Sequence, residues 1–201
     1  MILPVPATAA TASLDLSSDA GARDAEAEAE AERQLVLDVV HDSSALWRAP
    51  SHFRERRDLV HRCVTANGHA LVFASPALQG DRAIVAAAVR QDGGSLRYAS
   101  PELQADEEIV RLAVTQDGSA LYYADESLQR HKEIALHAVT HDPLALLYVE
   151  SKLRHTPELQ RTASRALERT RAAHLTPQHL DQLGLGTQLY RLRQHSRDPV
   201  G

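Results

Sequence analysis

Apolar residues recur at four positions of a pattern that repeats every 25 residues through the middle of the chain. In residues 106–130 they are Ile109, Val110, Ala113 and Val114, at positions i, i+1, i+4 and i+5. This spacing places the four side chains on one face of an α-helix of about three turns. The pattern therefore predicts one amphipathic helix per repeat, and its small third residue predicts close packing between helices.

Two adjacent stretches show the repeat most clearly. Residues 81–105 and 106–130 are identical at 13 of 25 aligned positions. A match this dense at a fixed offset indicates one structural unit that is used several times. Extending the offset without insertion gives five units, at residues 31–55, 56–80, 81–105, 106–130 and 131–155.

Asp or Asn follows the first predicted helix of every unit, and the three middle units add Gly: Asp42, Asn67-Gly68, Asp92-Gly93, Asp117-Gly118 and Asp142. We expect the glycine to adopt the left-handed conformation that ends a helix, and the Asp or Asn oxygen to cap the next helix. That second helix is short and carries a constant leucine, at Leu46, Leu71, Leu96, Leu121 and Leu146. Because no segment alternates with period two, strands are not expected. The predicted fold is an all-α solenoid of five 25-residue helix-turn-helix repeats.

The two ends of the chain differ from the repeats in composition. Residues 1–30 are predicted to be a disordered acidic leader, in which any helix after Arg23 is solvated or extends the first repeat. Residues 156–183 are predicted to form C-terminal capping helices, which start at Thr156-Pro157 and Thr176-Pro177. Residues 184–201 are predicted to be a basic flexible tail.

Charge and hydropathy narrow the classes of function. The chain has a formal net charge of -5, and residues 1–33 alone sum to -5, so the remainder is neutral. A neutral body gives no electrostatic basis for a nucleic-acid surface or an anionic membrane surface. No apolar run approaches the roughly 20 residues that span a bilayer. We expect a cytoplasmic protein, or one exported by a specialised secretion system without a cleavable signal peptide.

The consensus of the units is itself informative. Units of the form D-x-E-I-V-x-x-A-V-x-Q-D/N-G-x-A-L-x-Y-A-S-x-E-L, best seen in DEEIVRLAVTQDGSALYYADESL, resemble the bacterial repeats known as domain of unknown function 4116. The resemblance covers residues 56–155 well and 31–55 weakly. It implies a helical tandem-repeat protein of bacteria, some relatives of which have features of exported or host-directed proteins, and it implies no catalytic residues. His131, Pro143 and Val149 depart from the consensus, so the helix caps of the last unit are expected to differ.

Three other patterns have simpler structural explanations. His137 and His141 lie one helical turn apart and could face one metal ion, but no third ligand is identifiable, so solvated or end-capping histidines are favoured and no cofactor is expected. The single cysteine, Cys63, occupies the small-residue column and is predicted to be a buried thiol that forms no internal disulfide. An aromatic column is predicted to serve packing rather than base stacking, at Phe73, Tyr98, Tyr123 and Tyr148.

The candidate binding positions are those at which the repeats differ while the frame is constant. One column faces outward on the second helix and a comparable one lies on the first; they supply Trp47, Val72, Arg97, Tyr122 and Leu147, with His61 and Arg111. Trp, Tyr and Arg dominate the energetics of protein interfaces. The favoured function is therefore a non-enzymatic protein-protein interaction scaffold. Such a scaffold would act as an exported bacterial effector or as an adaptor.

Two alternatives belong to other classes of function. A nucleic-acid-binding helical repeat protein would need a basic track, whereas residues 34–155 carry 13 basic and 16 acidic residues. A metal-dependent enzyme would use His137 and His141. The expected partner is another protein, without a membrane; the sequence does not fix the oligomeric state.

Overall fold

The computed structural model describes residues 16–170, which contain helices and no strand. The chain divides into two units, residues 1–34 and 35–201. The first helix, α1 (Leu16–His41), crosses this division. The remaining elements are, in order, α2 (Ala45–Arg48), η1 (Ser51–Arg54), α3 (Arg57–Ala66), η2 (Gly68–Phe73), α4 (Pro76–Gln79), α5 (Arg82–Gln91), η3 (Gly93–Tyr98), α6 (Pro101–Gln104), α7 (Glu107–Gln116), η4 (Gly118–Tyr123), α8 (Glu126–Gln129), α9 (Lys132–His141), η5 (Pro143–Leu147), α10 (Ser151–Arg154) and α11 (Pro157–Thr170).

The first unit is helical from Leu16 onward. The predicted acidic leader over residues 1–30 is helical where the structure describes it, and after Arg23 this helix extends the first repeat, as the sequence allowed; residues 1–15 lie outside the described residues. The alternating alanine and glutamate of residues 25–32 have high helix propensity, which explains a helix without an apolar stripe. The same helix continues to Leu35 and Val39, which are buried and begin the first repeat.

Each repeat from the second to the fifth contains three helical segments. A ten-residue α-helix comes first, a 3-10 helix (η) of five or six residues follows, and a four-residue α-helix ends the repeat. The helix-turn-helix prediction is thus confirmed, and the structure adds the 3-10 geometry and the third segment. The first repeat differs, because its second segment is the α-helix α2 and its third is the 3-10 helix η1.

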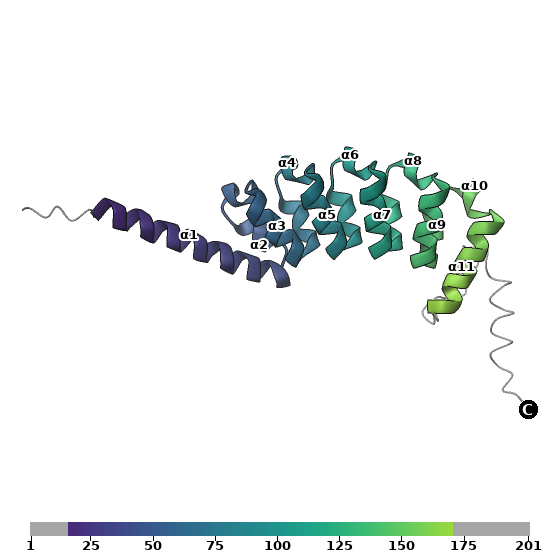
Figure 1. Cartoon of the computed structure of the whole chain (residues 1–201), viewed down its shortest axis with the longest axis horizontal. Coiled ribbons are helices and arrows are strands. Elements are labelled where there is room, and N and C mark those ends of the chain that lie inside the picture. Colours follow the sequence, from purple (N-terminus) through teal and green to yellow (C-terminus); the bar gives the residue numbers. More distant parts are fainter. Residues whose placement is uncertain (1–15, 171–201) are drawn as a thin grey trace, which may run out of the picture. The chain divides into compact units, whose positions relative to one another are not determined.

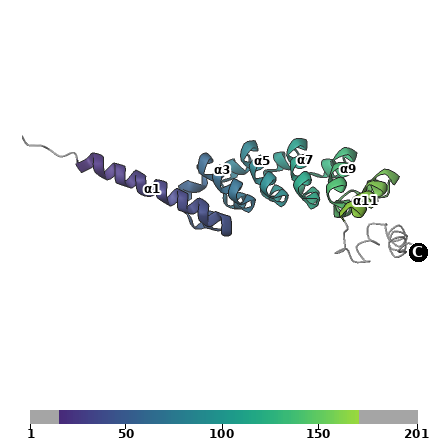
Figure 2. The ribbon, with the colours of Figure 1, turned by 60° about the horizontal axis from the view of Figure 1, so that its bottom comes forward.

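The long helices and the 3-10 helices form two rows within the second unit. α3, α5, α7, α9 and α11 contact one another in succession, and so do η2, η3, η4 and η5. The repeats accordingly follow one another side by side in both views (Figures 1 and 2). The predicted apolar columns fill the space between the rows, and their largest members are fully buried: Leu46, Leu59, Leu71, Ile84, Leu96, Ile109, Leu121, Ile134, Leu146 and Leu159.

The glycines allow neighbouring repeats to approach closely. A Cβ atom on Gly93 would lie 2.5 Å from the carbonyl oxygen of Ala113, and one on Gly68 would lie 2.6 Å from that of Ala88. Neither glycine has a positive φ, so the prediction of a left-handed conformation is wrong. The preceding residue ends the helix instead by adopting an extended backbone, with φ of -150° at Asp92. Glycine is needed here because a backbone of the next repeat occupies the space of a side chain.

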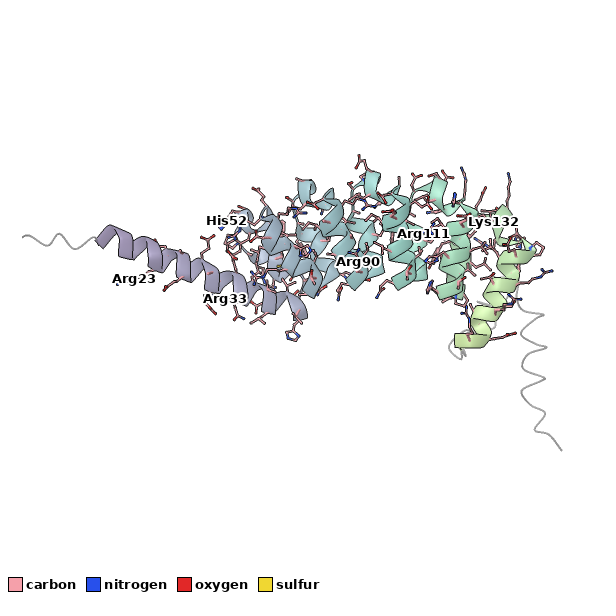
Figure 3. All side chains as sticks on the ribbon, viewed as in Figure 1. Arg23, Arg33, His52, Arg90, Arg111 and Lys132 are labelled. Carbon is pink, nitrogen blue, oxygen red and sulfur yellow. The ribbon has the colours of Figure 1, made fainter. Side chains whose placement is uncertain are left out.

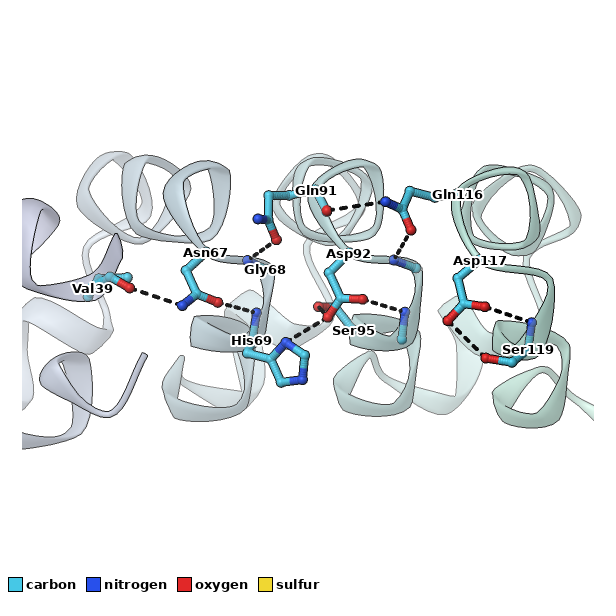
Figure 4. Close-up of polar contacts among 12 residues, drawn as sticks. Val39, Asn67, Gly68, His69, Gln91, Asp92, Ser95, Gln116, Asp117 and Ser119 are labelled. Carbon is cyan, nitrogen blue, oxygen red and sulfur yellow. Dashed lines mark hydrogen bonds and ion pairs between the residues drawn. The ribbon is translucent and has the colours of Figure 1, made fainter. Parts of the chain in front are cut away.

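The Asp and Asn column caps the 3-10 helices, as predicted. The side-chain oxygen of each accepts a hydrogen bond from the backbone N–H two residues later, at 3.2 Å for Asn67, 3.0 Å for Asp92 and 2.9 Å for Asp117 (Figure 4). Each bond satisfies a donor that the start of a helix leaves without an intrahelical partner. The column is therefore explained by local capping in every one of these repeats.

Two glutamines connect successive repeats beside these caps. Gln91 Oε1 accepts the N–H of Gly68 at 2.7 Å, and Gln116 Oε1 accepts the N–H of Gly93 at 3.2 Å (Figure 4). Each glutamine belongs to the repeat after the glycine that it binds. The close approach that glycine permits thus brings its backbone N–H to a side-chain acceptor of the next repeat.

The acid stability of the stack should depend on Asp81. Its carboxylate caps α5 by accepting the N–H groups of Ala83 and Ile84, and Arg57 of the preceding repeat donates to it at 2.6 Å. These bonds, that from Arg57 above all, lower the pKa of Asp81 below its ordinary value of 3.8. Because the pKa is lower in the folded state, the contribution is complete above about pH 5, decreases below the ordinary pKa of 3.8, and is lost as the pH falls through the folded pKa.

We therefore predict that Asp81→Asn reduces the loss of unfolding free energy between pH 7 and pH 3. Asparagine is also a good N-cap, so the substitution removes the charge and retains the cap. The difference should be below about 1 kcal/mol, because Arg57 is largely exposed. Urea unfolding of both proteins at the two pH values measures it, and an unchanged pH dependence would contradict the assignment.

The last described helix closes the stack. α11 packs against α9 and η5, and Leu159, Ala163 and Leu167 are buried. This confirms the capping helix predicted to begin at Thr156-Pro157. The second predicted start, at Thr176-Pro177, and the basic tail over residues 184–201 lie outside the described residues.

Candidate functional site

The outward positions of the second helical segments form one column, which we call the contact ladder: Trp47, Val72, Arg97, Tyr122 and Leu147. Trp47 and Tyr122 are large apolar residues that stay 61% and 62% exposed. Arg97 is exposed as well, and Val72 and Leu147 are half-buried. The ladder therefore presents unlike side chains at equivalent places of successive repeats.

The local sequence explains why these side chains face outward. Each ladder residue follows the constant leucine of its repeat; in the fourth repeat, Leu121 is fully buried immediately before the exposed Tyr122. In the middle repeats an aromatic residue comes next, and Tyr123 packs partly buried against the core. With two neighbours held inward, the residue between them is directed to solvent.

Contacts with neighbouring rings hold the exposed ladder residues in place. The guanidinium of Arg97 lies over the Tyr98 ring at 4.5 Å from its centroid. The Tyr122 ring lies 5.2 Å from that of Tyr123 and 5.5 Å from that of Tyr148 in the next repeat. Such contacts restrict side-chain rotation before any partner binds, which lowers the entropic cost of association.

The structure places the other two predicted residues on different elements. His61 is exposed on α3, and Arg111 is exposed on α7, where it donates to Glu107 at 2.7 Å. Arg90 and Arg111 extend from α5 and α7 in Figure 3 and line a groove of about 390 Å³ with His137. His61 and Arg111 thus belong to the row of long helices, whereas the ladder follows the row of short segments.

The repeat period agrees with a family model. The model described as Domain of unknown function (DUF4116) matches residues 56–104, 81–129 and 106–154, with successive matches displaced by one 25-residue unit. Residues 56–154 are DUF4116 repeats. This confirms the resemblance seen in the sequence. Comparison with curated proteins and with solved structures found no match.

The histidine pair of the last DUF4116 repeat lies on one side of α9. The rings of His137 and His141 are 4.9 Å apart between centroids, and His137 Nε2 is 2.7 Å from the hydroxyl oxygen of Thr115. Burial, His141 and Arg111 lower the pKa of His137. Within residues 16–170, no group of three or more His, Cys, Asp or Glu residues is placed to hold a metal ion.

The structure bears out the packing roles assigned to two columns of the DUF4116 repeats. Cys63 is fully buried in α3, and burial raises the pKa of its thiol to about 11. A thiol that stays protonated at neutral pH is a poor nucleophile. The aromatic column is partly buried against the core, as expected: Phe73, Tyr98, Tyr123 and Tyr148.

One functional column of the DUF4116 repeats was not recognised from the sequence. Gln79 Nε2 donates to the carbonyl oxygens of Leu71 and Val72, at 3.1 and 3.3 Å. Gln104 makes the equivalent bonds to Leu96 and Arg97, whereas Gln129 donates to the carbonyl oxygens of Tyr122 and Ala124. The signal was available, because glutamine recurs at the 25-residue offset. This column fixes the carbonyls of the ladder residues themselves, so it positions the ladder.

Within the helices of residues 16–170, none combines the length and the apolar character required to cross a bilayer.

Proposed function

We propose that the repeat stack is a non-enzymatic protein-binding scaffold, and that its partner contacts the ladder. One observation carries the proposal: exposed and unlike side chains occupy the same place in successive repeats whose buried residues are nearly constant. Selection for folding explains the constant positions, but it does not call for a tryptophan and a tyrosine that remain more than half exposed. A partner protein that covers these two side chains would explain why they are exposed.

The chemistry of the ladder supports a protein partner. Trp, Tyr and Arg are the residues most enriched at energetically important places of interfaces. The ladder has one of each, at Trp47, Arg97 and Tyr122. Trp47 and Arg97 are two repeats apart, and Arg97 and Tyr122 are one repeat apart. The repeats resemble those of bacterial proteins, so we propose a bacterial adaptor or exported effector as the setting.

Replacing Trp47, Arg97 and Tyr122 together by alanine should weaken partner capture at least about tenfold, because even one such residue commonly contributes about 2 kcal/mol to binding. The helical content should stay unchanged, since the side chains are exposed. Quantitative pulldown of the partner from the native cell, with far-UV circular dichroism of each variant, measures both.

A double variant, Glu102→Ala with Glu126→Ala, is the matched control. Both residues are exposed on the short α-helices α6 and α8, whereas Arg97 and Tyr122 of the ladder lie on the 3-10 helices η3 and η4. The control should capture the partner as the wild type does. Equal capture by the triple variant and the wild type would refute the proposed ladder, and equal loss in both variants would indicate a non-specific electrostatic contact.

A further inference from the structure

A groove opens between the first and second repeats, at one end of the ladder. Its volume is about 560 Å³, within the range of about 300–1,000 Å³ that is typical of ligand pockets. Trp47 and Val72, the first two ladder residues, both line it, together with Phe73 and Arg54. The groove is therefore part of the exposed surface and also has apolar walls.

Arg54 differs from its counterparts in the other repeats. At the equivalent place, Gln79, Gln104 and Gln129 bind two carbonyl oxygens of their own repeats, and Arg154 binds those of Leu147 and Val149. The Arg54 guanidinium instead lies over the Trp47 ring, 4.8 Å from its centroid. Among the described residues its buried Nε has no hydrogen-bond partner. Arg154 Nε lacks a partner as well, so Arg54 is distinguished by the position of its guanidinium over the Trp47 ring, at the wall of the groove.

The other walls of the groove indicate which chemical groups a bound ligand could carry beside its negative charge. The Trp47 and Phe73 rings are 6.3 Å apart and tilted by 42°, which leaves an apolar wall beside the guanidinium. Two hydroxyl groups also line the groove, those of Ser51 and Ser75. Ser75 does not use its side chain to cap α4, so its hydroxyl can donate to a ligand.

The charges around the groove favour a ligand with a single negative group. Glu55 is exposed and also lines the groove, so a second carboxylate near it would be repelled. Arg48, close in sequence, is already paired with Asp42 at 2.8 Å. Arg54 is therefore the cation that remains to bind an acidic group.

We propose that this groove binds a peptide segment that carries one carboxylate next to a bulky apolar side chain. The carboxylate accepts hydrogen bonds from Arg54 in the forked geometry that guanidinium groups provide, and the apolar side chain packs against Trp47, Val72 and Phe73. The inference rests on the proposed function, because the peptide would be part of the protein that covers the ladder.

The test uses the full chain and three synthetic peptides. The first is acetyl-Gly-Ser-Leu-Glu-Ser-Gly-amide, the second has glutamine in place of glutamate, and the third is acetyl-Gly-Ser-Leu with a free carboxyl terminus. Trp47 is the only tryptophan, so the indole N–H resonance in a ¹⁵N-labelled sample reports on the groove alone. We expect a saturable shift with the first peptide and at least about fivefold weaker binding of the glutamine peptide.

Variants identify the groups that bind. Arg54→Gln introduces the residue that repeats two to four carry at this place, so the fold should be kept, and it should weaken binding of the glutamate peptide to the level of the glutamine peptide. Glu55→Gln should strengthen binding of the glutamate peptide. The third peptide distinguishes a carboxyl terminus from an acidic side chain, according to which binds more tightly.

Three results would overturn the inference: no shift of the indole resonance with any peptide, equal binding of the glutamate and glutamine peptides, or no effect of Arg54→Gln. The proposed function fails separately. If the triple ladder variant loses capture and Arg54→Gln retains both capture and peptide binding, the ladder stands and the acidic-peptide groove does not.

Discussion

Replacing Gly93 by alanine is expected to lower the free energy of unfolding by about 1–3 kcal/mol, the usual cost of forcing extra atoms into a well-packed interior. The new Cβ would lie 2.5 Å from the carbonyl oxygen of Ala113 and 3.1 Å from the backbone nitrogen of Asp117. Both atoms belong to the backbone of the next repeat and cannot rotate away. Relief therefore requires two repeats to separate, and urea unfolding followed by circular dichroism measures the cost.

The neighbouring glycine is a matched control. A Cβ atom on Gly94 would meet nothing nearer than the Asp92 side chain, at 3.4 Å, and its φ is not positive. Gly94→Ala should therefore leave stability unchanged or raise it by up to about 1 kcal/mol, because alanine restricts the unfolded chain. Equal destabilisation by the two substitutions would show that loss of glycine, rather than contact between repeats, is responsible.

Replacing Leu96 by alanine is expected to lower the free energy of unfolding by about 2–5 kcal/mol, the range for a fully buried leucine. Leu96 is 0% exposed in the central repeat. The lost methyl groups leave a cavity between the two rows of helices that the glycine contacts and glutamine bonds hold at a fixed spacing. The midpoint of thermal or urea unfolding should shift accordingly.

The control for Leu96 makes the same change at an exposed leucine. Leu37 is 61% exposed on α1, so Leu37→Ala should change stability by no more than about 0.5 kcal/mol. If the two substitutions had equal effects, the assignment of the leucine column to the core would be wrong.

The periodic part of the structure could be predicted because packing and capping use the same residue in each repeat. The column that contains Leu96 is apolar in all five units, and burial is its simplest explanation. Glycine was different. Gly93 is compatible with either a left-handed backbone or a close neighbour, and only the distance to Ala113 in the next repeat decides between them. The start of α1 at Leu16 could not be predicted, because residues 16–22 have neither an apolar stripe nor the alternating alanine and glutamate that favour a helix after Arg23.

The candidate site could be predicted only in part. Outward placement of Trp47 and Tyr122 followed from their position beside the buried leucine. The groove did not follow, because it depends on Arg54 lying over the Trp47 ring instead of binding carbonyl oxygens as Arg154 does. Arg54 and Arg154 occupy equivalent places but make different contacts. The repeat pattern alone does not distinguish them.

Photo-crosslinking from single ladder positions tests the central claim most directly. A benzophenone amino acid is introduced in place of Tyr122, or in place of Trp47, and in a third protein in place of the exposed Glu102. After irradiation in the native cell, both ladder positions should crosslink to the same protein, and Glu102 should not. The claim that the ladder is a contact surface would be contradicted if Glu102 gave that product as strongly, or if neither ladder position gave a protein adduct.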